Sequence, residues 1–302
     1  MADAIRIRSS GDYCAAVDGE LAPLKELVRA TLGEPVRRIG RFIQLALIGA
    51  GRCVGSTAPD AATAVYLTSG RGDLEITIEV METLFRRGQS PMPLSFINTV
   101  SNSACYYVAR QFGLHGRSSF ICNRYFAFES ALQLALLDLR AGLVESALVG
   151  AVDLAVAPLQ HHRRRLGLAE NAALAEGSHW LWLQRDSDAK DDEQTPQLLD
   201  ARQFGDRDQL DAWLHEWAPQ RADIALASGQ FLSADVSDQI IEAHGFDARF
   251  DYRSGRGYYD SHSGAAVGAF LQVGASERPL LLHLNGDVDG RFAAMLVRAG
   301  TK

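Results

Sequence analysis

The sequence predicts a layered α/β fold, because short apolar segments with strand character alternate with segments of helical periodicity. Residues 147–152 (ALVGAV) are continuously apolar, as in a strand that is covered on both faces. Residues 125–142 carry apolar side chains on one helical face and end at Gly142. Residues 118–122 form a short extended segment before them. The middle of the chain therefore predicts a strand, a buried helix and a second, buried strand.

The rest of the chain continues this alternation. Helical periodicity or amphipathic character predicts helices at residues 37–51, 73–87, 102–112, 235–244 and 264–273. Gly113 ends the third of these, because glycine tolerates the left-handed conformation of a helix end. Strands are expected at residues 64–68, 179–184, 223–227, 249–252 and 280–284. Residues 69–72 read as a turn, and the acidic segment 186–195 as a surface loop.

The composition restricts the classes of function. The 302 residues are 47% hydrophobic and 22% charged, which is ordinary for a globular protein, and the net charge of −7 argues against a nucleic-acid surface. No apolar segment is long enough to span a membrane, and the N-terminal residues do not resemble a signal peptide. The four widely spaced cysteines frame no zinc site and favour a reducing, cytoplasmic location. We expect no cofactor and no metal.

The central motifs resemble the β-ketoacyl synthase family of the thiolase superfamily. The family pattern combines an N-x-x-A helix, G-L-x-G, a strand, a nucleophile turn, R-x-G and the strand A-L-V-G-G. Here the matching residues are Asn102, Gly113-Leu114-His115-Gly116, 118–122, Arg140-Ala141-Gly142 and Ala147-Leu148-Val149-Gly150-Ala151. The resemblance implies a five-layered αβαβα fold built from two related halves. These are expected at residues 1–185 and, in shortened form, at 186–302.

The nucleophile position departs from the family pattern. In the family, a cysteine stands nine residues after the last glycine of G-L-x-G and seventeen before the glycine of R-x-G. Both counts lead to Tyr125 in this chain. A phenol, with a pKa near 10, cannot replace a thiolate as the acyl carrier. The usual condensing reaction therefore cannot start on this chain.

The other catalytic positions of the family are also altered. The first histidine, in H-G-T-G-T, is matched by Ser228 in Ser228-Gly229-Gln230-Phe231-Leu232, and a hydroxyl cannot carry the charge of an imidazolium. The second histidine is retained as His262, which we interpret as a structural remnant at a helix start. In the glycine-rich gating loop, Asp287 and Asp289 stand where the family has phenylalanines.

The resemblance therefore predicts a chain length factor, a non-catalytic subunit similar to the aryl-polyene type of bacteria. It implies a heterodimer with an active β-ketoacyl synthase, which shapes the tunnel for the growing acyl chain and receives acyl carrier protein through the complex. We expect Tyr125 and Phe126 to plug the chain's own pocket. The residues expected to line the tunnel or the interface are Ser95, Phe96, Asn98, Val100, Tyr106, Tyr107, Ser118, Phe120, Cys122 and Phe126.

Two alternatives remain open at this point. A divergent condensing enzyme could use Cys122, although a cysteine inside a strand is expected to be a buried, inert side chain. A homodimeric acyl-binding scaffold is the other alternative. The basic segment from His161 to Arg165 could contact an acidic carrier protein or form a solvated helix end.

Overall fold

The structure is a computed structural model that describes residues 4–19, 21–186, 195–274 and 278–300. The strands are β1 (Ala4–Val17), β2 (Ala64–Ser69), β3 (Ser118–Cys122), β4 (Ser146–Asp153), β5 (Leu174–Asp186), β6 (Gln197–Phe204), β7 (Ile224–Ser228), β8 (Leu280–Gly286) and β9 (Phe292–Arg298). The helices are α1 (Lys25–Leu32), α2 (Arg41–Val54), α3 (Leu74–Phe85), α4 (Pro93–Asn98), α5 (Ser103–Phe112), α6 (Ala127–Arg140), α7 (Leu159–Leu166), α8 (Arg207–Glu216), α9 (Ala234–His244) and α10 (Ser263–Val273). A short 3-10 helix covers Ala218–Asp223.

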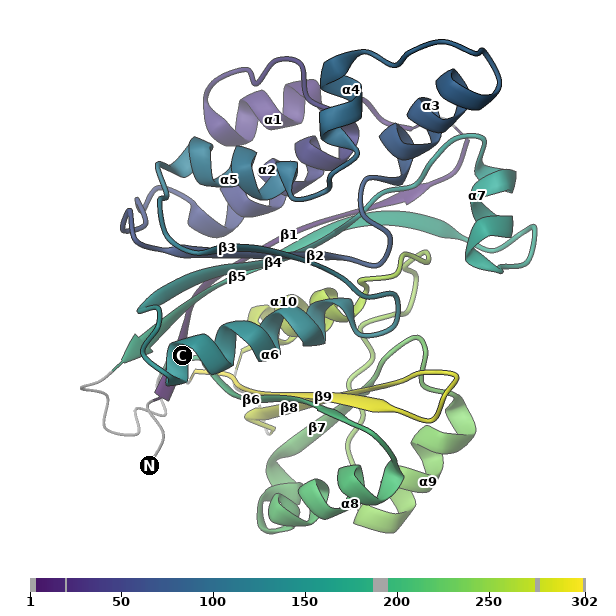
Figure 1. The fold of residues 1–302 in the computed structure, drawn as a ribbon. Coiled ribbons are helices and arrows are strands. Elements are labelled where there is room, and N and C mark those ends of the chain that lie inside the picture. Colours follow the sequence, from purple (N-terminus) through teal and green to yellow (C-terminus); the bar gives the residue numbers. More distant parts are fainter. Residues whose placement is uncertain (1–3, 20, 187–194, 275–277, 301–302) are drawn as a thin grey trace.

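The strands form a sheet in the order β3-β2-β4-β5-β1-β6-β9-β8-β7. Strands β3, β2 and β4 are parallel, as are β7 and β8, whereas β5 and β9 pair antiparallel with their neighbours. Within the described residues, the two parts of the sheet are joined where Ile5 and Arg6 of β1 pair with Leu198 and Gln197 of β6. On either side of this short connection, the two parts of the sheet face each other (Figure 1).

Five layers result from this arrangement. Helices α6 and α10 lie between the two parts of the sheet, α2 and α5 cover the outer face of the first part, and α8 and α9 cover the second (Figure 1). One apolar core joins the central helices to both parts of the sheet, and each outer helical layer has a core of its own. The largest lies around α6 and α10, where Phe128, Leu132 and Leu136 are buried. The predicted αβαβα architecture is therefore confirmed.

Most predicted elements have the expected type. Strand β3 has the predicted bounds, and α5 ends at Gly113, whose φ of 65° is left-handed. Residues 249–252 are not a strand, since Arg249 makes only an isolated bridge to Leu226. The reason is that the Asp251 carboxylate accepts hydrogen bonds from the N–H groups of Arg253 and Ser254 and turns the chain. Most of the predicted loop 186–195 lies outside the described residues.

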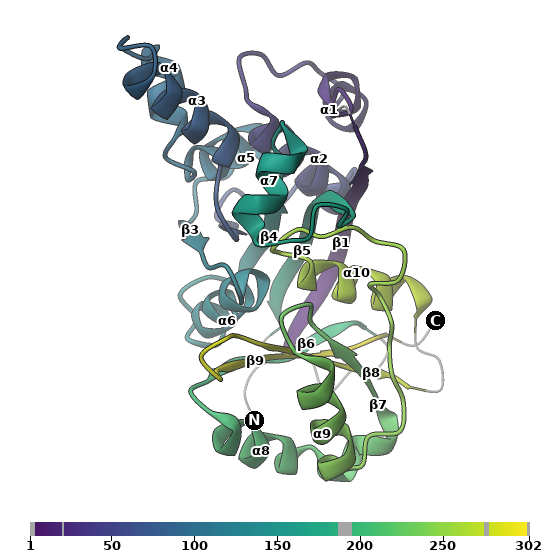
Figure 2. The ribbon, with the colours of Figure 1, turned by 90° about the vertical axis from the view of Figure 1, so that its right-hand side faces the viewer.

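The segment containing α3 and α4 extends away from the rest of the molecule (Figure 2). We call residues 74–100 the arm. Its base is fixed where the Asp73 N–H donates to the Ser101 hydroxyl at 2.9 Å, and where the Asp73 carboxylate caps α3 by accepting from Ile76 N–H. Among the described helices, none has the length and apolar character that crossing a membrane requires.

Candidate functional site

Tyr125 lies in the turn between β3 and α6, at the position that the motif spacing predicts. The Asn123 side chain forms this turn by accepting hydrogen bonds from the N–H groups of Tyr125 at 3.2 Å and Phe126 at 3.3 Å. From the second part of the sheet, Asn285 donates to the Tyr125 carbonyl at 3.0 Å. The backbone of the turn is therefore held from both sides, and the side chain at its tip is a phenol.

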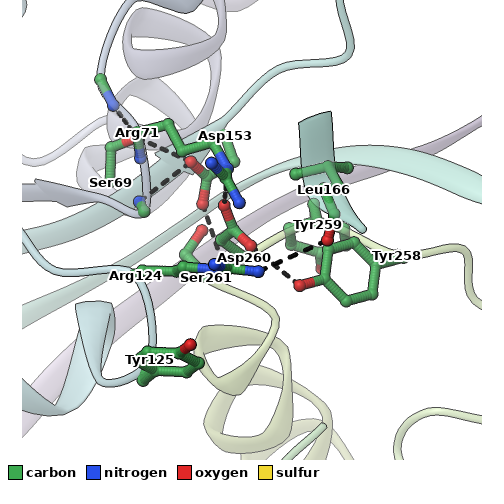
Figure 3. A network of polar contacts seen from close by, with 12 residues as sticks. Ser69, Arg71, Arg124, Tyr125, Asp153, Leu166, Tyr258, Tyr259, Asp260 and Ser261 are labelled. Carbon is green, nitrogen blue, oxygen red and sulfur yellow. Dashed lines mark hydrogen bonds and ion pairs between the residues drawn. The ribbon is translucent and has the colours of Figure 1, made fainter. Parts of the chain in front are cut away.

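Aromatic and cationic side chains surround the Tyr125 ring. Phe231 meets it edge-on, with ring centroids 5.0 Å apart, and Tyr258 meets Phe231 edge-on at 6.2 Å. The Arg124 guanidinium lies 5.2 Å from the Tyr125 ring centroid, and its Nη2 donates to the Leu166 carbonyl at 3.4 Å (Figure 3). In the sequence match above, Phe231 stands where the family motif H-G-T-G-T has its second glycine. Sequence reasoning had not assigned a role to Phe231, Tyr258 or Arg124.

His262 directly precedes α10 and is 2% exposed. Within the described residues, neither of its ring nitrogens has a hydrogen-bond partner. Its ring stacks on Tyr252 at 5.2 Å and contacts the Tyr259 ring edge-on at 4.8 Å. Burial lowers the pKa of His262 to about 3, and the neighbouring His179 and Arg256 act in the same direction. A neutral imidazole packed between two aromatic rings fits the interpretation as a structural remnant.

Ser228 lies at the end of β7, where the family places its first histidine. Its hydroxyl lies 2.6 Å from the Ser237 hydroxyl on α9. This pairing satisfies Ser228 locally, with a group that carries no charge. The Ser228 hydroxyl cannot act as the imidazolium that would stabilise the enolate formed during a condensing reaction.

A buried polar network that the sequence did not reveal lies behind the turn. Glu129 is fully buried and accepts hydrogen bonds from Asn285 and Ser263, each at 3.1 Å. Its Oε1 lies 3.7 Å from Nδ1 of His283, whose Nε2 lies 2.9 Å from the Tyr252 hydroxyl. Burial raises the pKa of Glu129 to about 7 and lowers that of His283 to about 3. The sequence did carry one signal for this network, since Glu129 is a charged residue on the apolar face of the predicted helix at 125–142.

Arg71, in the turn after β2, joins the two halves of the chain. Its Nε donates to Asp260 at 2.8 Å, and the Tyr258 hydroxyl donates to the other carboxylate oxygen of Asp260 at 2.9 Å (Figure 3). Gly70 is required beside this contact, because a Cβ at that position would come within 2.2 Å of Asp260. Arg71 therefore fixes the loop before α10 against the end of β2.

Asp153, at the end of β4, also holds the loop that precedes α10. Its carboxylate accepts hydrogen bonds from the Ser69 hydroxyl at 2.6 Å and from the Ser261 N–H at 2.7 Å. Burial raises the pKa of Asp153 to about 6, and the nearby charge of Asp260 adds to the effect. The adjacent cavity, lined in part by Arg71 and His162, has a volume of about 10 Å³. That space suits a single water molecule rather than an acyl chain.

Cys122 lies in β3, as expected, but it is exposed rather than buried. The expectation of a buried side chain is wrong because β3 is the last strand of the sheet and has a neighbour on one side only. The thiol lies 3.6 Å from the Gly70 carbonyl. Partial burial raises its pKa, and the carboxylates of Asp153 and Asp260 raise it further. A reactive cysteine needs the opposite shift, so these surroundings disfavour Cys122 as a nucleophile.

The residues expected to face a partner fall into three groups. Phe96, Val100 and Tyr106 have exposed fractions of 58%, 55% and 60%. Asn98 and Phe126, in contrast, are buried within the chain itself and are not available to line a tunnel formed with a partner. The remaining residues of the set lie at the surface or are partly buried: Ser95, Tyr107, Ser118, Phe120 and Cys122.

Further exposed apolar side chains, not expected from the sequence, lie close to this group on the arm. They are Met81, Leu84, Phe85, Met92, Leu94 and Ile97. Together with Phe96 and Val100 they form what we call the arm surface. Soluble chains seldom expose so many large apolar residues in one segment without a partner.

The basic segment forms helix α7. His162 is buried in it and Arg163 donates to the Ala172 carbonyl, whereas Arg164 and Arg165 are exposed. Burial and the nearby arginines lower the pKa of His162 to about 4, so this side chain is neutral at pH 7. Among the described residues, no cluster of three or more His, Cys, Asp or Glu side chains could hold a metal ion.

Comparisons with known proteins identify the fold. No family model and no curated protein matches the sequence. Among solved structures, the chain is similar to the ishigamide ketosynthase/chain length factor, with a TM-score of 0.72 and 16% identity over 98% of this chain and 99% of that chain. A β-ketoacyl synthase from Burkholderia phymatum STM815 gives 0.72 and 11%, over 98% and 99%. The ketosynthase complex AntDE:AntF, with its type II polyketide acyl carrier protein, gives 0.65 and 12%, over the same shares.

Proposed function

From this ketosynthase fold, we propose that the chain is a non-catalytic, ketosynthase-like subunit that pairs with an active β-ketoacyl synthase as a chain length factor. The observation that carries the proposal is Tyr125, a phenol held at the tip of an intact strand-turn-helix. No acyl thioester can form on its side chain. The loss of the first histidine at Ser228 and the unpartnered, neutral His262 support the same conclusion.

The arm surface and the edge strand β3 support the proposed pairing. Strand β3 has β2 on one side and ends the sheet on the other, so its outer backbone groups can extend the sheet into a partner. The arm surface adds apolar area of the kind that protein interfaces cover. We propose that Phe96, Val100 and Tyr106 contact the partner and limit the volume of its acyl tunnel.

The proposed chemistry is that of type II polyketide or fatty-acid-like biosynthesis in the cytoplasm of bacteria, with an aryl-polyene-like product. In this proposal, acyl carrier protein delivers the extender units to the active partner. The solved complexes named above, which include a ketosynthase with its carrier protein, support this assignment by likeness of fold. In this proposal, the chain itself limits the volume of the partner's acyl tunnel and carries no covalent acyl intermediate.

The test is co-expression with the ketosynthase encoded in the same gene cluster, followed by purification and reaction with an acyl carrier thioester. We expect a one-to-one complex in which intact-mass analysis finds the acyl group on the partner only. Elongation of the thioester by this chain alone, or a stable acyl adduct on Cys122, would overturn the proposal. A homodimer that forms no complex with the ketosynthase would favour the scaffold alternative.

A further inference from the structure

We infer that a basic cleft beside the arm receives an acidic segment of the partner ketosynthase, so that charge as well as apolar contact selects the partner. The basic cleft lies where the loop before α2, helix α5 and the first turn of α4 meet. Its lining includes Arg37, Arg38, Leu94, Tyr107, Arg110 and Gln111. The inference rests on the proposed function and names the chemistry by which the proposed partner is recognised.

The basic cleft has room for side chains of another protein. Its volume is about 520 Å³, whereas the cavity beside Arg71 holds about 10 Å³. A second cavity, of about 360 Å³, shares residues 35–38 with the cleft as part of its lining. Arg37 and Arg38 in this shared loop are both exposed. Their guanidinium groups can therefore be reached from the solvent.

The charge along the two cavities is opposite to that of the whole chain, whose net charge is −7. Five cationic side chains line them, namely Lys25, Arg29, Arg37, Arg38 and Arg110. The acidic side chains of the lining are Glu26 and Glu34, which leaves a local balance of +3. A local excess of positive charge attracts an acidic surface and orients it as it approaches.

The chain does not neutralise these cations itself. Within the described residues, none of the five has a hydrogen-bonded or ion-paired carboxylate. The neighbouring Glu34 instead accepts a hydrogen bond from the Gln111 side chain at 3.1 Å, which joins the loop to α5. The cationic groups of the cleft therefore remain available to acidic side chains of another molecule.

The backbone is strained where it presents Arg38. Among the residues that the structure describes, Arg38 is the one non-glycine residue with a positive φ, at 58°. A left-handed conformation is unfavourable for an L-residue that carries a Cβ. Strain of this kind is found preferentially at sites that bind other molecules. The strained loop is thus consistent with a binding role for the cleft.

The arm indicates which molecule occupies the cleft. Leu94 belongs both to the arm surface and to the wall of the cleft, and it is 42% exposed. Tyr107 lines the same wall, and its ring meets that of Tyr106 edge-on at 5.5 Å. A protein that covers Leu94 must also lie over the cleft. Since arginines buried there without a counter-charge oppose binding, the partner that covers the arm needs acidic side chains at this position.

The first test measures the binding of the full chain to the ketosynthase encoded in the same gene cluster. Arg37→Glu combined with Arg110→Glu reverses the charge on two walls of the cleft. We expect the dissociation constant to rise at least about tenfold at physiological ionic strength. Added salt should weaken the wild-type complex more than the variant complex, because ions screen attraction between exposed charges. Binding is measured by biolayer interferometry over a range of salt concentrations.

A matched control is Arg221→Glu combined with Arg256→Glu. Both arginines are exposed and lie in residues 186–302, and the pair changes the net charge by the same amount. The control should bind as the wild type does, and both variants should unfold near the wild-type temperature because all four side chains are exposed. An equal loss of affinity in the two variants would overturn the inference, since net charge rather than the cleft would then govern binding.

The second test identifies the molecule in the cleft. Arg37→Lys combined with Arg110→Lys keeps the positive charge and places two amines there. A water-soluble carbodiimide joins such an amine to a carboxyl group in direct contact with it, forming an amide while the carbodiimide is converted to a urea. The variant is treated in a mixture with the ketosynthase and its acyl carrier protein, and peptide mass spectrometry locates the amides. We expect them to join position 37 or 110 to Asp or Glu of the ketosynthase.

The outcomes separate this inference from the proposed function. Amides to the carrier protein or to a second copy of the chain, in place of the ketosynthase, would overturn the inference. A ketosynthase that binds the wild type and the charge-reversed variant equally well refutes the role of the cleft and leaves the proposed function intact. A wild-type chain that forms no complex with the ketosynthase refutes the proposed function itself.

Discussion

At the scale of single residues, His262 combines deep burial with ring nitrogens that have no partner in the described part of the chain. His262 is 2% exposed, and within the described residues its nitrogens contact no donor or acceptor. Burying two polar nitrogens without partners opposes folding. The aromatic rings of Tyr252 and Tyr259 on either side are the favourable contacts that it retains.

The first prediction follows from this imbalance. His262→Phe keeps a ring between Tyr252 and Tyr259 and removes the unpartnered nitrogens, so we expect the free energy of unfolding at pH 7 to stay within about 1 kcal/mol of the wild type or to rise. The measurement is urea denaturation. The same change at His179, whose nitrogens lie 2.6 Å from Asp12 and 2.7 Å from the Tyr259 hydroxyl, is the control and should cost about 2–3 kcal/mol. Equal losses at both positions would contradict the interpretation of His262 as a remnant.

The second prediction concerns Glu129, whose pKa burial raises to about 7. Because the pKa of Glu129 is higher in the folded protein than in the unfolded chain, protonated Glu129 favours folding. This stabilisation is complete below the unfolded pKa, near 4.5, and is lost as the pH rises through about 7. We expect Glu129→Gln to remove this loss, which is on the order of 3 kcal/mol between pH 4 and pH 8. The measurement is the free energy of unfolding of both proteins at pH 5, 6, 7 and 8.

The comparison isolates Glu129 from remote groups, and its neighbour His283, 3.7 Å away, has a folded-state pKa of about 3, below the pH range of the measurement. The buried histidines act in the opposite direction: the pKa values of His262 and His283 are lowered to about 3, so the stability linked to them is complete above about 6.5 and is lost as the pH falls toward 3. Parallel pH profiles of the wild type and Glu129→Gln would show that Glu129 is not the group responsible.

At the scale of elements, the helices of the arm are far less buried than the helices that pack in the core. Helix α2 is buried over most of its length, whereas α3 has Val80 as its buried residue and α4 has Asn98. An amphipathic helix gains most of its stability from packing its apolar face. The arm presents that face outward, which is favourable only when another surface covers it.

The third prediction tests the arm directly. Phe96→Asp with Ile97→Asp is expected to weaken binding to the partner ketosynthase at least about tenfold, because charged side chains cannot be buried there without a partner. Binding is measured by biolayer interferometry. Val288→Asp is the matched control, since Val288 is a 79% exposed apolar residue in the loop between β8 and β9.

The control variant should bind as the wild type does. The arm variants should also unfold at the wild-type temperature, because both replaced side chains are more than half exposed in the isolated chain. Unchanged binding by the arm variants would remove the arm from the proposed interface.

At the scale of the whole molecule, two parts of one sheet share a central helical layer. Besides that layer and the short pairing of β1 with β6, the contacts between residues 1–185 and 186–302 include those of Arg71 with Asp260 and of Asp153 with Ser261. Both carboxylates are buried, so each depends on its partners in the other half.

The fourth prediction concerns the ion pair. Arg71→Met leaves Asp260 buried without its cation, and we expect a loss of about 2–4 kcal/mol of unfolding free energy. Arg71→Met combined with Asp260→Asn removes the charge as well and is expected to recover at least half of that loss. The measurement is urea denaturation of the two variants and the wild type at pH 7. A double variant no more stable than the single one would mean that packing, rather than the buried charge, sets the cost.

The sequence by itself determined the type of most elements and the position of Tyr125. Apolar runs such as residues 147–152, helical spacing and Gly113 are local signals, and motif spacing fixes a position along the chain without reference to contacts. The missed strand β1 also carried a local signal, since Ile5 and Ile7 alternate with Arg6 and Arg8 and both isoleucines are buried.

Only the tertiary structure decided which side chains surround that position. Phe231 and Tyr258 come from segments far from Tyr125 in the sequence, and the contact of Phe231 with Tyr125 depends on two parts of the sheet coming face to face. The exposure of Cys122 and the burial of Asn98 and Phe126 likewise depend on which neighbours each element acquires. Local patterns specify elements because backbone geometry is local, whereas burial and pairing arise from residues far apart in the sequence.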